Sequence, residues 1–243
     1  MKSLKLHFES LLDDDDVHFE SLLDDEDIFY GTNSDKKIIE GWIKNNYNFS
    51  GKLTISDDFI VDCSGAVKVK NKTITSLTNG LFRWGRVSRN FICVGCKNLK
   101  SLDGSPKKVN MGYYCNDCNS LTSLEGAPEI VRGNFYCDNC PKLKSLEGTP
   151  KKIKSSFSCS SCENLKSLEG APEEVGSDFH CSNCNKLTSL KGAPRKCQDF
   201  YCMDCKNLKS LEGAPEVVRG LTCFNCKNLT ITDSDRKKYK IVD

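Results

Sequence analysis

The stretch CQDFYCMDCKNLKSL at residues 197–211 carries the pattern that decides the fold. An aromatic residue stands two positions before a cysteine, a second cysteine follows three positions later, and two leucines follow at intervals of three. With small variations this unit recurs seven times from Phe91 onward, and such periodicity is typical of repeat proteins. Its CxxC pairs begin at Cys93, Cys115, Cys137, Cys159, Cys181, Cys202 and Cys223, which gives spacings of 22, 22, 22, 22, 21 and 21 residues.

Each unit predicts one rung of a stacked array. The aromatic residue and the first cysteine alternate across a variable position, which is the period-two pattern of a short strand with one buried face. In six units a Gly-x-Pro corner follows the leucines and leads to an apolar position, as at Val109. One rung alone would gain on the order of 10 kcal/mol from apolar burial, against roughly 1 to 2 kcal/mol of backbone ordering per residue. A rung therefore folds only in a stack.

This frame resembles the leucine-rich repeat, in the cysteine-containing variety where cysteine replaces the asparagine that closes the turn after the strand. The recurring sequence SLEGAP is similar to sequences in short-repeat arrays of bacteria and tailed phages. The resemblance covers about residues 75–230. It implies a parallel-stranded solenoid that presents a surface to partners, and it implies no particular activity.

We therefore predict a β-rich solenoid, with a leucine-rich-repeat-like parallel sheet of about seven rungs, degenerate rungs before them and a short N-terminal helical cap. The sign of the charge after the corner proline alternates along the array, and opposite charges on neighbouring rungs would reinforce the register. This column reads Lys107, Glu129, Lys151, Glu173, Arg195, Glu216. The predicted divisions are an acidic, disordered leader at 1–33, the cap and degenerate rungs at 34–90, the array at 91–232 and a polar tail at 233–243.

The segment before the array predicts the cap. A capping residue at Ser34 or Asp35 precedes apolar residues at helical spacing, which indicates a helix near residues 35–46. We expect its Ile39, Trp42 and Ile43 to cover the first rung. Short strands are expected at 53–55, 59–61 and 67–69, and the polar tail either closes the array or frays.

The sixteen cysteines allow three interpretations, of which disulfides are the least favoured because cytosolic thiols stay reduced. A CxxC pair repeated after about 20 residues lies in the range of four-thiolate zinc sites, so one hypothesis is a zinc-stabilised array that could also bind nucleic acid. However, seven pairs leave a remainder when grouped two by two, and the first cysteine of each pair already has an inward position. We therefore expect buried, reduced thiols without a metal or other cofactor. Cys197 replaces a core valine, and Cys63 is expected at a strand end.

Catalysis is not expected. Two of the three histidines lie in the acidic leader, and motifs such as HExxH or GxSxG do not occur. Glutamates such as Glu125 and Glu147 recur once per rung, as a solvated rim would. The sequence predicts a non-enzymatic protein-interaction module. We expect it in the cytoplasm, because no apolar stretch is long enough to span a bilayer and the N-terminus has acids where a secretory signal needs a longer apolar run.

The outward residues of the predicted strands form the candidate partner surface. Aromatic side chains offer contact area at low entropic cost, although they also favour β-structure without any binding role. Polar and thioether side chains two positions further on complete the strip. The candidate partner-binding residues are Tyr114, Tyr136, His180, Tyr201, Asn116, Asp138 and Met203.

Charge is distributed unevenly. Residues 1–30 carry two lysines and ten acids, a net of −8, so the remaining residues carry +2 − (−8) = +10. A basic body could bind nucleic acid or be screened by its own tail, but lysines and acids are mixed along the rungs and we expect a protein partner. The leader repeats an eleven-residue motif twice, which suits either a bivalent docking peptide or a solvated tail. The candidate docking residues are Phe8, Leu11, Leu12, Phe19, Leu22 and Leu23.

Overall fold

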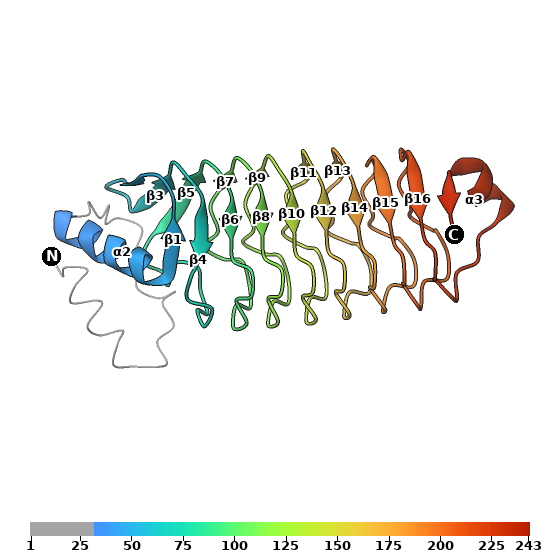
Figure 1. Ribbon diagram of the computed structural model, residues 1–243, viewed down its shortest axis with the longest axis horizontal. Coiled ribbons are helices and arrows are strands. Elements are labelled where there is room, and N and C mark those ends of the chain that lie inside the picture. The colour runs from blue at the N-terminus through green and yellow to red at the C-terminus, as the bar shows by residue number, and fades with distance from the viewer. Residues whose placement is uncertain (1–31) are drawn as a thin grey trace, which may run out of the picture.

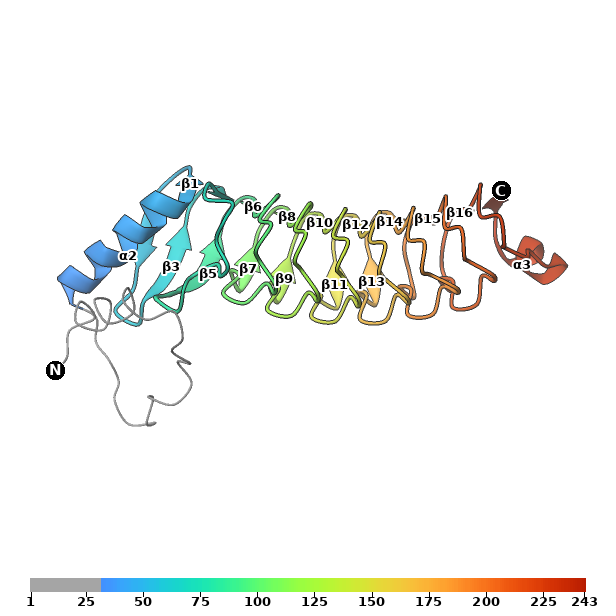
Figure 2. The same ribbon diagram turned by 90° about the horizontal axis from the view of Figure 1, so that it is seen from below.

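The computed structural model describes residues 32–243, which form one elongated β-solenoid (Figure 1). The chain winds through about eight turns of about 22 residues, and the turns stack side by side along one axis (Figure 2). The predicted fold class, a parallel β-solenoid with a short N-terminal helix, is confirmed.

A ten-stranded sheet, sheet A, contains the strand that the repeat predicts. β1 and β4 pair antiparallel, and all later neighbours pair parallel, so that equivalent residues of successive rungs lie side by side. Its strands, in spatial order, are β1 (Tyr47–Phe49), β4 (Val67–Val69), β6 (Phe91–Ile92), β8 (Tyr113–Tyr114), β10 (Phe135–Tyr136), β12 (Phe157–Ser158), β14 (Phe179–His180), β15 (Asp199–Tyr201), β16 (Gly220–Thr222) and β17 (Ile241–Val242).

A second, seven-stranded sheet, sheet B, runs along another side of the rungs. The strands expected at 53–55 and 59–61 are two of its members, at Leu53–Ile55 and Ile60–Cys63, but its repeated strands were not predicted. Its repeated strands are two residues long and end on the buried apolar residue that follows the Gly-x-Pro corner, as at Val109. In the two 21-residue rungs, Lys196 and Val217 continue this side only as isolated parallel bridges. The strands of sheet B are β13 (Glu174–Val175), β11 (Lys152–Ile153), β9 (Ile130–Val131), β7 (Lys108–Val109), β5 (Arg83–Val87), β3 (Ile60–Cys63) and β2 (Leu53–Ile55).

The core is a set of parallel side-chain ladders. The inward aromatic residues from Phe91 to Phe200 stack with ring centroids 5.1 to 5.5 Å apart, and all are fully buried. The paired leucines of each rung pack against them. Cys197 is buried in the valine column and Cys63 ends β3, as the sequence predicted.

The cysteine pairs add a hydrogen-bonded ladder to this core. In successive rungs the second thiol donates to the main-chain carbonyl of the first cysteine one rung back, at S···O distances of 3.0 to 3.4 Å. First thiols donate forward, as Cys137 does to the Ser158 carbonyl at 3.3 Å. Burial raises the pKa of thiols such as Cys137 and Cys202, which keeps them protonated and able to donate. The thiols therefore join neighbouring rungs as well as filling space.

The turn inside each CxxC pair explains its variable residues. The residue before the second cysteine has a positive φ in all seven rungs, a conformation that glycine, asparagine and aspartate tolerate best. Six rungs have one of these three types, and the fourth has Ser161 at φ 60°. These residues are Gly95, Asp117, Asn139, Ser161, Asn183, Asp204 and Asn225.

Some of the charged side chains that follow the corner prolines form ion pairs between rungs. Lys151 Nζ lies 3.2 Å from Glu173 Oε1 on the next rung, as the alternation suggested. Arg195, however, pairs with Glu174 of the adjacent column, at 3.3 Å between Nη2 and Oε1. These contacts are exposed, so each contributes at most about 1 kcal/mol.

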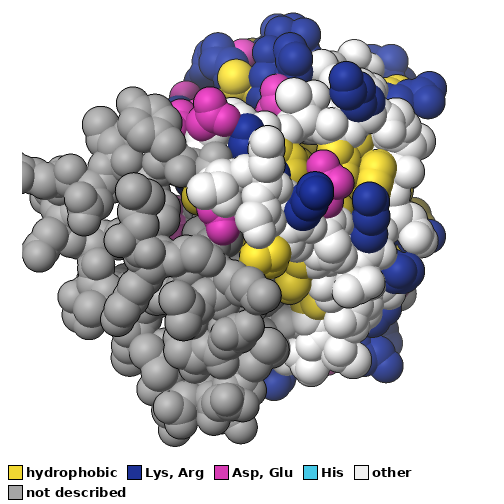
Figure 3. Space-filling model, turned by 90° about the vertical axis from the view of Figure 1, so that its left-hand side faces the viewer, with side chains coloured by type: hydrophobic (Ala, Val, Ile, Leu, Met, Phe, Trp, Pro, Cys, Tyr) yellow, Lys and Arg dark blue, Asp and Glu magenta, His cyan; other side chains and the backbone are white. Residues whose placement is uncertain are grey.

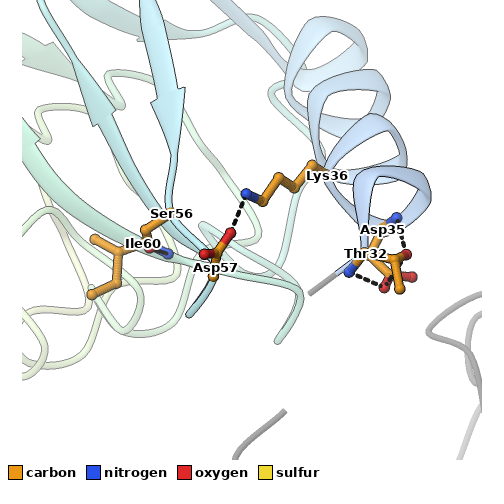
Figure 4. Close-up of polar contacts among 6 residues, drawn as sticks. All are labelled: Thr32, Asp35, Lys36, Ser56, Asp57 and Ile60. Carbon is orange, nitrogen blue, oxygen red and sulfur yellow. Dashed lines mark hydrogen bonds and ion pairs between the residues drawn. The ribbon is translucent and has the colours of Figure 1, made fainter. Parts of the chain in front are cut away.

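The helix α2 (Asn33–Asn46) caps the N-terminal end. Its N-cap is Thr32 rather than Ser34 or Asp35, because Thr32 and Asp35 form a reciprocal capping box (Figure 4). Ile39 and Ile43 are fully buried and Trp42 packs partly against Phe82, as expected for a cap. Lys36 Nζ also contacts Asp57 Oδ1, in the turn between β2 and β3, at 2.5 Å (Figure 4).

The tail closes the C-terminal end of the array. The helix α3 (Asp233–Lys238) starts from a capping box of Thr232 and Asp235, and β17 then pairs with β16. The Cys223 amide donates to the Val242 carbonyl at 2.9 Å, so β17 replaces the strand of a further rung. Within residues 32–243, neither helix has the length and apolar character needed to cross a membrane.

Candidate recognition surface

The outward side chains of sheet A form one continuous line. Register pairing places Tyr114 beside Tyr136, Tyr136 beside Ser158, and Ser158 beside His180. Tyr201 follows His180 on the next rung. The four predicted strip residues in this line are each partly exposed, and the alternation that buries Phe135 and Phe157 directs them outward.

Two aromatic pairs lie on either side of one small residue. Tyr114 and Tyr136 meet edge to face, with ring centroids 5.6 Å apart. His180 and Tyr201 stack in parallel planes at 4.6 Å. Ser158, between the two pairs, is buried at 7% exposure. The outward line thus consists of two pairs of rings, with the Ser158 hydroxyl between them.

Asp138 anchors the centre of the strip. Its carboxylate accepts hydrogen bonds from the Ser158 hydroxyl and from the Ser160 amide, the latter at 2.8 Å. Its own amide donates to Asn116 Oδ1 at 3.2 Å. Burial raises the pKa of the Asp138 carboxyl, although these hydrogen bonds oppose the shift. The predicted residues Asn116 and Asp138 therefore belong to one network.

Met203 is partly exposed in the column that also contains Asn116 and Asp138. Its amide donates to Ser182 Oγ at 3.2 Å, which fixes the backbone of this rung. The structure thus places all seven predicted partner-binding residues on the outward side of sheet A or the turn that follows it.

Two aspartates that were not predicted for this surface lie two positions before residues of the outward line. Asp178 and Asp199 lie on the same face as His180 and Tyr201, because residues i and i+2 of a strand point the same way. Arg219 Nε donates to Asp199 Oδ1 at 3.2 Å, and this hydrogen bond holds the pKa of Asp199 below its usual value. Extending the period-two alternation two residues back from His180 and Tyr201 would have identified both aspartates.

The cysteines do not contribute to this surface. Within residues 32–243, no three or more His, Cys, Asp or Glu side chains are arranged to hold a metal ion. The leader residues Phe8, Leu11, Leu12, Phe19, Leu22 and Leu23 lie outside the described residues.

His180 provides a pH-dependent probe of the strip. Burial lowers the pKa of its imidazole, while the carboxylates of Asp178 and Asp138 oppose that shift. We expect its NMR titration midpoint to lie below the ordinary value of about 6.5, and to fall further in Asp178→Asn. The histidine is neutral above the unfolded-state pKa, and its share of stability is lost as pH falls through the lower folded-state pKa.

The measurement follows the imidazole Cε1 proton of the full chain from pH 4 to pH 8, and His180→Gln identifies the signal. A midpoint above 6.5, or one that rises in Asp178→Asn, would contradict the arrangement of these carboxylates around the imidazole.

At the level of architecture the chain is a repeat solenoid with turns of about 22 residues. Searches with family models, curated proteins and solved structures found no match to it.

Proposed function

We propose that the protein is a non-enzymatic interaction scaffold that binds a protein partner along the outward face of sheet A. The observation that carries this proposal is the row of two ring pairs, Tyr114 with Tyr136 and His180 with Tyr201, which the parallel register holds at fixed spacing. Aromatic residues on a rigid sheet lose little conformational entropy on binding. The mixed polar edge supplied by Asn116, Asp138 and Met203 suits the polar rim of a protein interface.

The repeat itself favours binding over catalysis. A catalytic site needs one asymmetric group of residues, whereas stacked rungs supply near-equivalent positions in a row. We further propose that the rungs belong to the cysteine-containing leucine-rich type, because the second cysteine closes the turn after the strand by bonding main-chain carbonyls. Sheet B is an addition to that pattern.

The thiol ladder supports a reducing compartment, and we propose the cytoplasm. All sixteen cysteines are free, and fifteen of them are buried. Since the second thiols of six rungs donate hydrogen bonds, oxidation of either member of a pair would remove a contact between rungs. Thiols of this kind persist where glutathione and thioredoxin keep them reduced.

The proposed surface is tested with a triple variant, Tyr114→Ala, Tyr136→Ala, Tyr201→Ala, and a matched control. The control removes three exposed apolar side chains on the side of sheet B, through Ile60→Ala, Ile130→Ala and Val217→Ala. Partners are captured from the source cells with each full-length protein, and the affinity of a purified partner is then measured directly. Loss of interface aromatics costs about 1 to 2 kcal/mol or more each, so we expect Kd to rise at least about 100-fold for the strip variant only.

Circular dichroism must first show that both variants keep the fold. Equal affinity for the strip variant and the unchanged protein would place the interface elsewhere. Equal weakening by the control variant would lead to the same conclusion.

A further inference from the structure

A second surface of the solenoid is defined by charge, independently of the aromatic strip. The four residues after the second cysteine of each rung contain nine lysines in seven rungs. All nine are exposed. We name this row the lysine ridge, and its members are Lys97, Lys100, Lys142, Lys144, Lys166, Lys186, Lys206, Lys209 and Lys227.

The ridge lysines have no acidic partners within the described residues. The nine ion pairs among residues 32–243 include none of them. In contrast, lysines at other corners pair across rungs, as Lys151 does with Glu173 and Lys191 with Glu212. Glu163 is the single acid among the ridge segments. The alternation that neutralises the rest of the solenoid is therefore absent along this row.

The ridge accounts for most of the net positive charge of the solenoid. Nine lysines and Glu163 give 9 − 1 = +8, while all residues after the leader carry +10. In Figure 3, which looks along the solenoid from its N-terminal side, Lys and Arg side chains lie along the upper, right-hand and lower outline. Outside the ridge segments and the leader, Lys and Arg nearly balance Asp and Glu, so the net positive charge comes mainly from the ridge.

The backbone beneath the ridge is fixed. The Lys144 amide donates to the Thr122 carbonyl, and the Thr122 amide to the Lys100 carbonyl, each at 3.1 Å. Asn164 and Asn207 add side-chain hydrogen bonds to the preceding rung. With about 4.8 Å between rungs, seven rungs hold the lysines along a row about 29 Å long.

We propose that the lysine ridge is a docking surface for an acidic peptide segment and that its occupant is the chain's own residues 1–31. This segment carries −8, equal and opposite to the ridge. Lysine ammonium groups act as flexible point charges, which suits a run of carboxylates without fixed geometry. The ridge offers no aromatic side chain for base stacking, which disfavours a single-stranded nucleic acid.

The tether makes the chain's own segment the favoured occupant. Thirty-one residues can reach up to about 100 Å when extended and span about 30 Å on average as a flexible chain. The helix α2, which starts directly after residue 32, lies at the N-terminal end of the solenoid (Figure 1), and the ridge starts with Lys97, shortly after β6. Covalent attachment gives an effective concentration in the millimolar range, which an external acidic partner has to exceed. The leader thereby screens the ridge against other polyanions.

The test is carbodiimide cross-linking of the full chain, which joins carboxylates directly to contacting lysines. A mixture of unlabelled and ¹⁵N-labelled protein separates links within one chain from links between chains. Mass mapping should place links from Asp13 to Asp16 and Asp24 to Asp27 on the ridge, within one chain. Their yield should fall several-fold at 1 M salt, where the screening length drops from about 10 Å to about 3 Å.

A charge-matched pair of variants sharpens the result. The ridge variant carries Lys142→Gln, Lys144→Gln, Lys166→Gln and Lys186→Gln, and links to the remaining Lys100, Lys206 and Lys209 should also decrease. The control carries Lys107→Gln, Lys108→Gln, Lys154→Gln and Lys196→Gln, and should leave those links unchanged. Links scattered over all exposed lysines, or formed mainly between chains, would overturn the proposal. So would tight binding of double-stranded DNA by the full chain that protects the ridge from labelling.

Discussion

Replacing Phe157 with alanine should lower the free energy of unfolding by about 3 to 5 kcal/mol. Phe157 is fully buried in the middle of the aromatic ladder, with ring centroids 5.5 Å from Phe135 and 5.2 Å from Phe179. The substitution loses apolar burial, leaves a cavity, and breaks two stacked contacts at once. Urea denaturation followed by circular dichroism measures the loss.

Tyr136→Ala is the matched control for Phe157→Ala. Tyr136 lies one rung away in the same sheet, but its ring points outward and is partly exposed. Its removal should cost no more than about 1 kcal/mol. If the two substitutions destabilised the protein equally, the assignment of inward and outward faces in sheet A would be wrong.

The rung could be predicted because its signals repeat. Alternation of Phe135 and Cys137 indicated one inward face, and seven copies of that alternation indicated parallel stacking. The same logic placed Cys197 in the valine column, where it is buried. Periodicity in sequence thus carries the tertiary contacts of a solenoid, because every rung meets its nearest neighbours in the chain.

The repeated strands of sheet B were not predicted, for a physical reason. A strand such as Lys108–Val109 has two residues and one buried side chain, so it shows no alternation that a sequence could reveal. Its pairing comes from main-chain hydrogen bonds between rungs, for example from the Asn110 amide to the Val87 carbonyl at 3.0 Å. These hydrogen bonds form only where the rungs already stack in register, so no residue type in the sequence indicates them.

The sequence also predicted only one of the two roles of the cysteines. Burial of thiols as small apolar groups follows from the strand pattern, but their donation to carbonyls depends on the turn geometry. The left-handed residue before each second cysteine, such as Asn139 at φ 54°, turns the chain inside the pair. The preference for Asn, Asp or Gly at this position is therefore the feature of the sequence that indicates the turn.

The candidate partner surface was likewise predicted only in part. The line of Tyr114, Tyr136 and Tyr201 follows from period-two alternation. The hydrogen bonds of Asp138 with Ser158 and Ser160 cross rungs and depend on which small residues stand opposite it. Sequence periodicity therefore finds the face, and the structure is needed to find which of its side chains are linked.

Gly170→Ala tests the spacing between rungs most directly. Gly170 has φ +84°, and a Cβ atom there would lie 2.3 Å from the Glu147 amide nitrogen and 2.5 Å from the Leu146 carbonyl carbon. The left-handed backbone costs about 1 to 2 kcal/mol for alanine, and the overlap with fixed backbone adds about 1 to 3 kcal/mol. We expect the urea midpoint to fall accordingly, by an amount equivalent to about 2 to 5 kcal/mol.

Gly95→Ala separates the two contributions. Gly95 also has a positive φ, +75°, but a Cβ atom there would meet no atom within 4 Å. It should therefore show the conformational cost alone, about 1 to 2 kcal/mol. If Gly170→Ala cost no more than Gly95→Ala, neighbouring rungs would not be in the close backbone contact that stacks the Gly-x-Pro corners, and the register of the array would have to be revised.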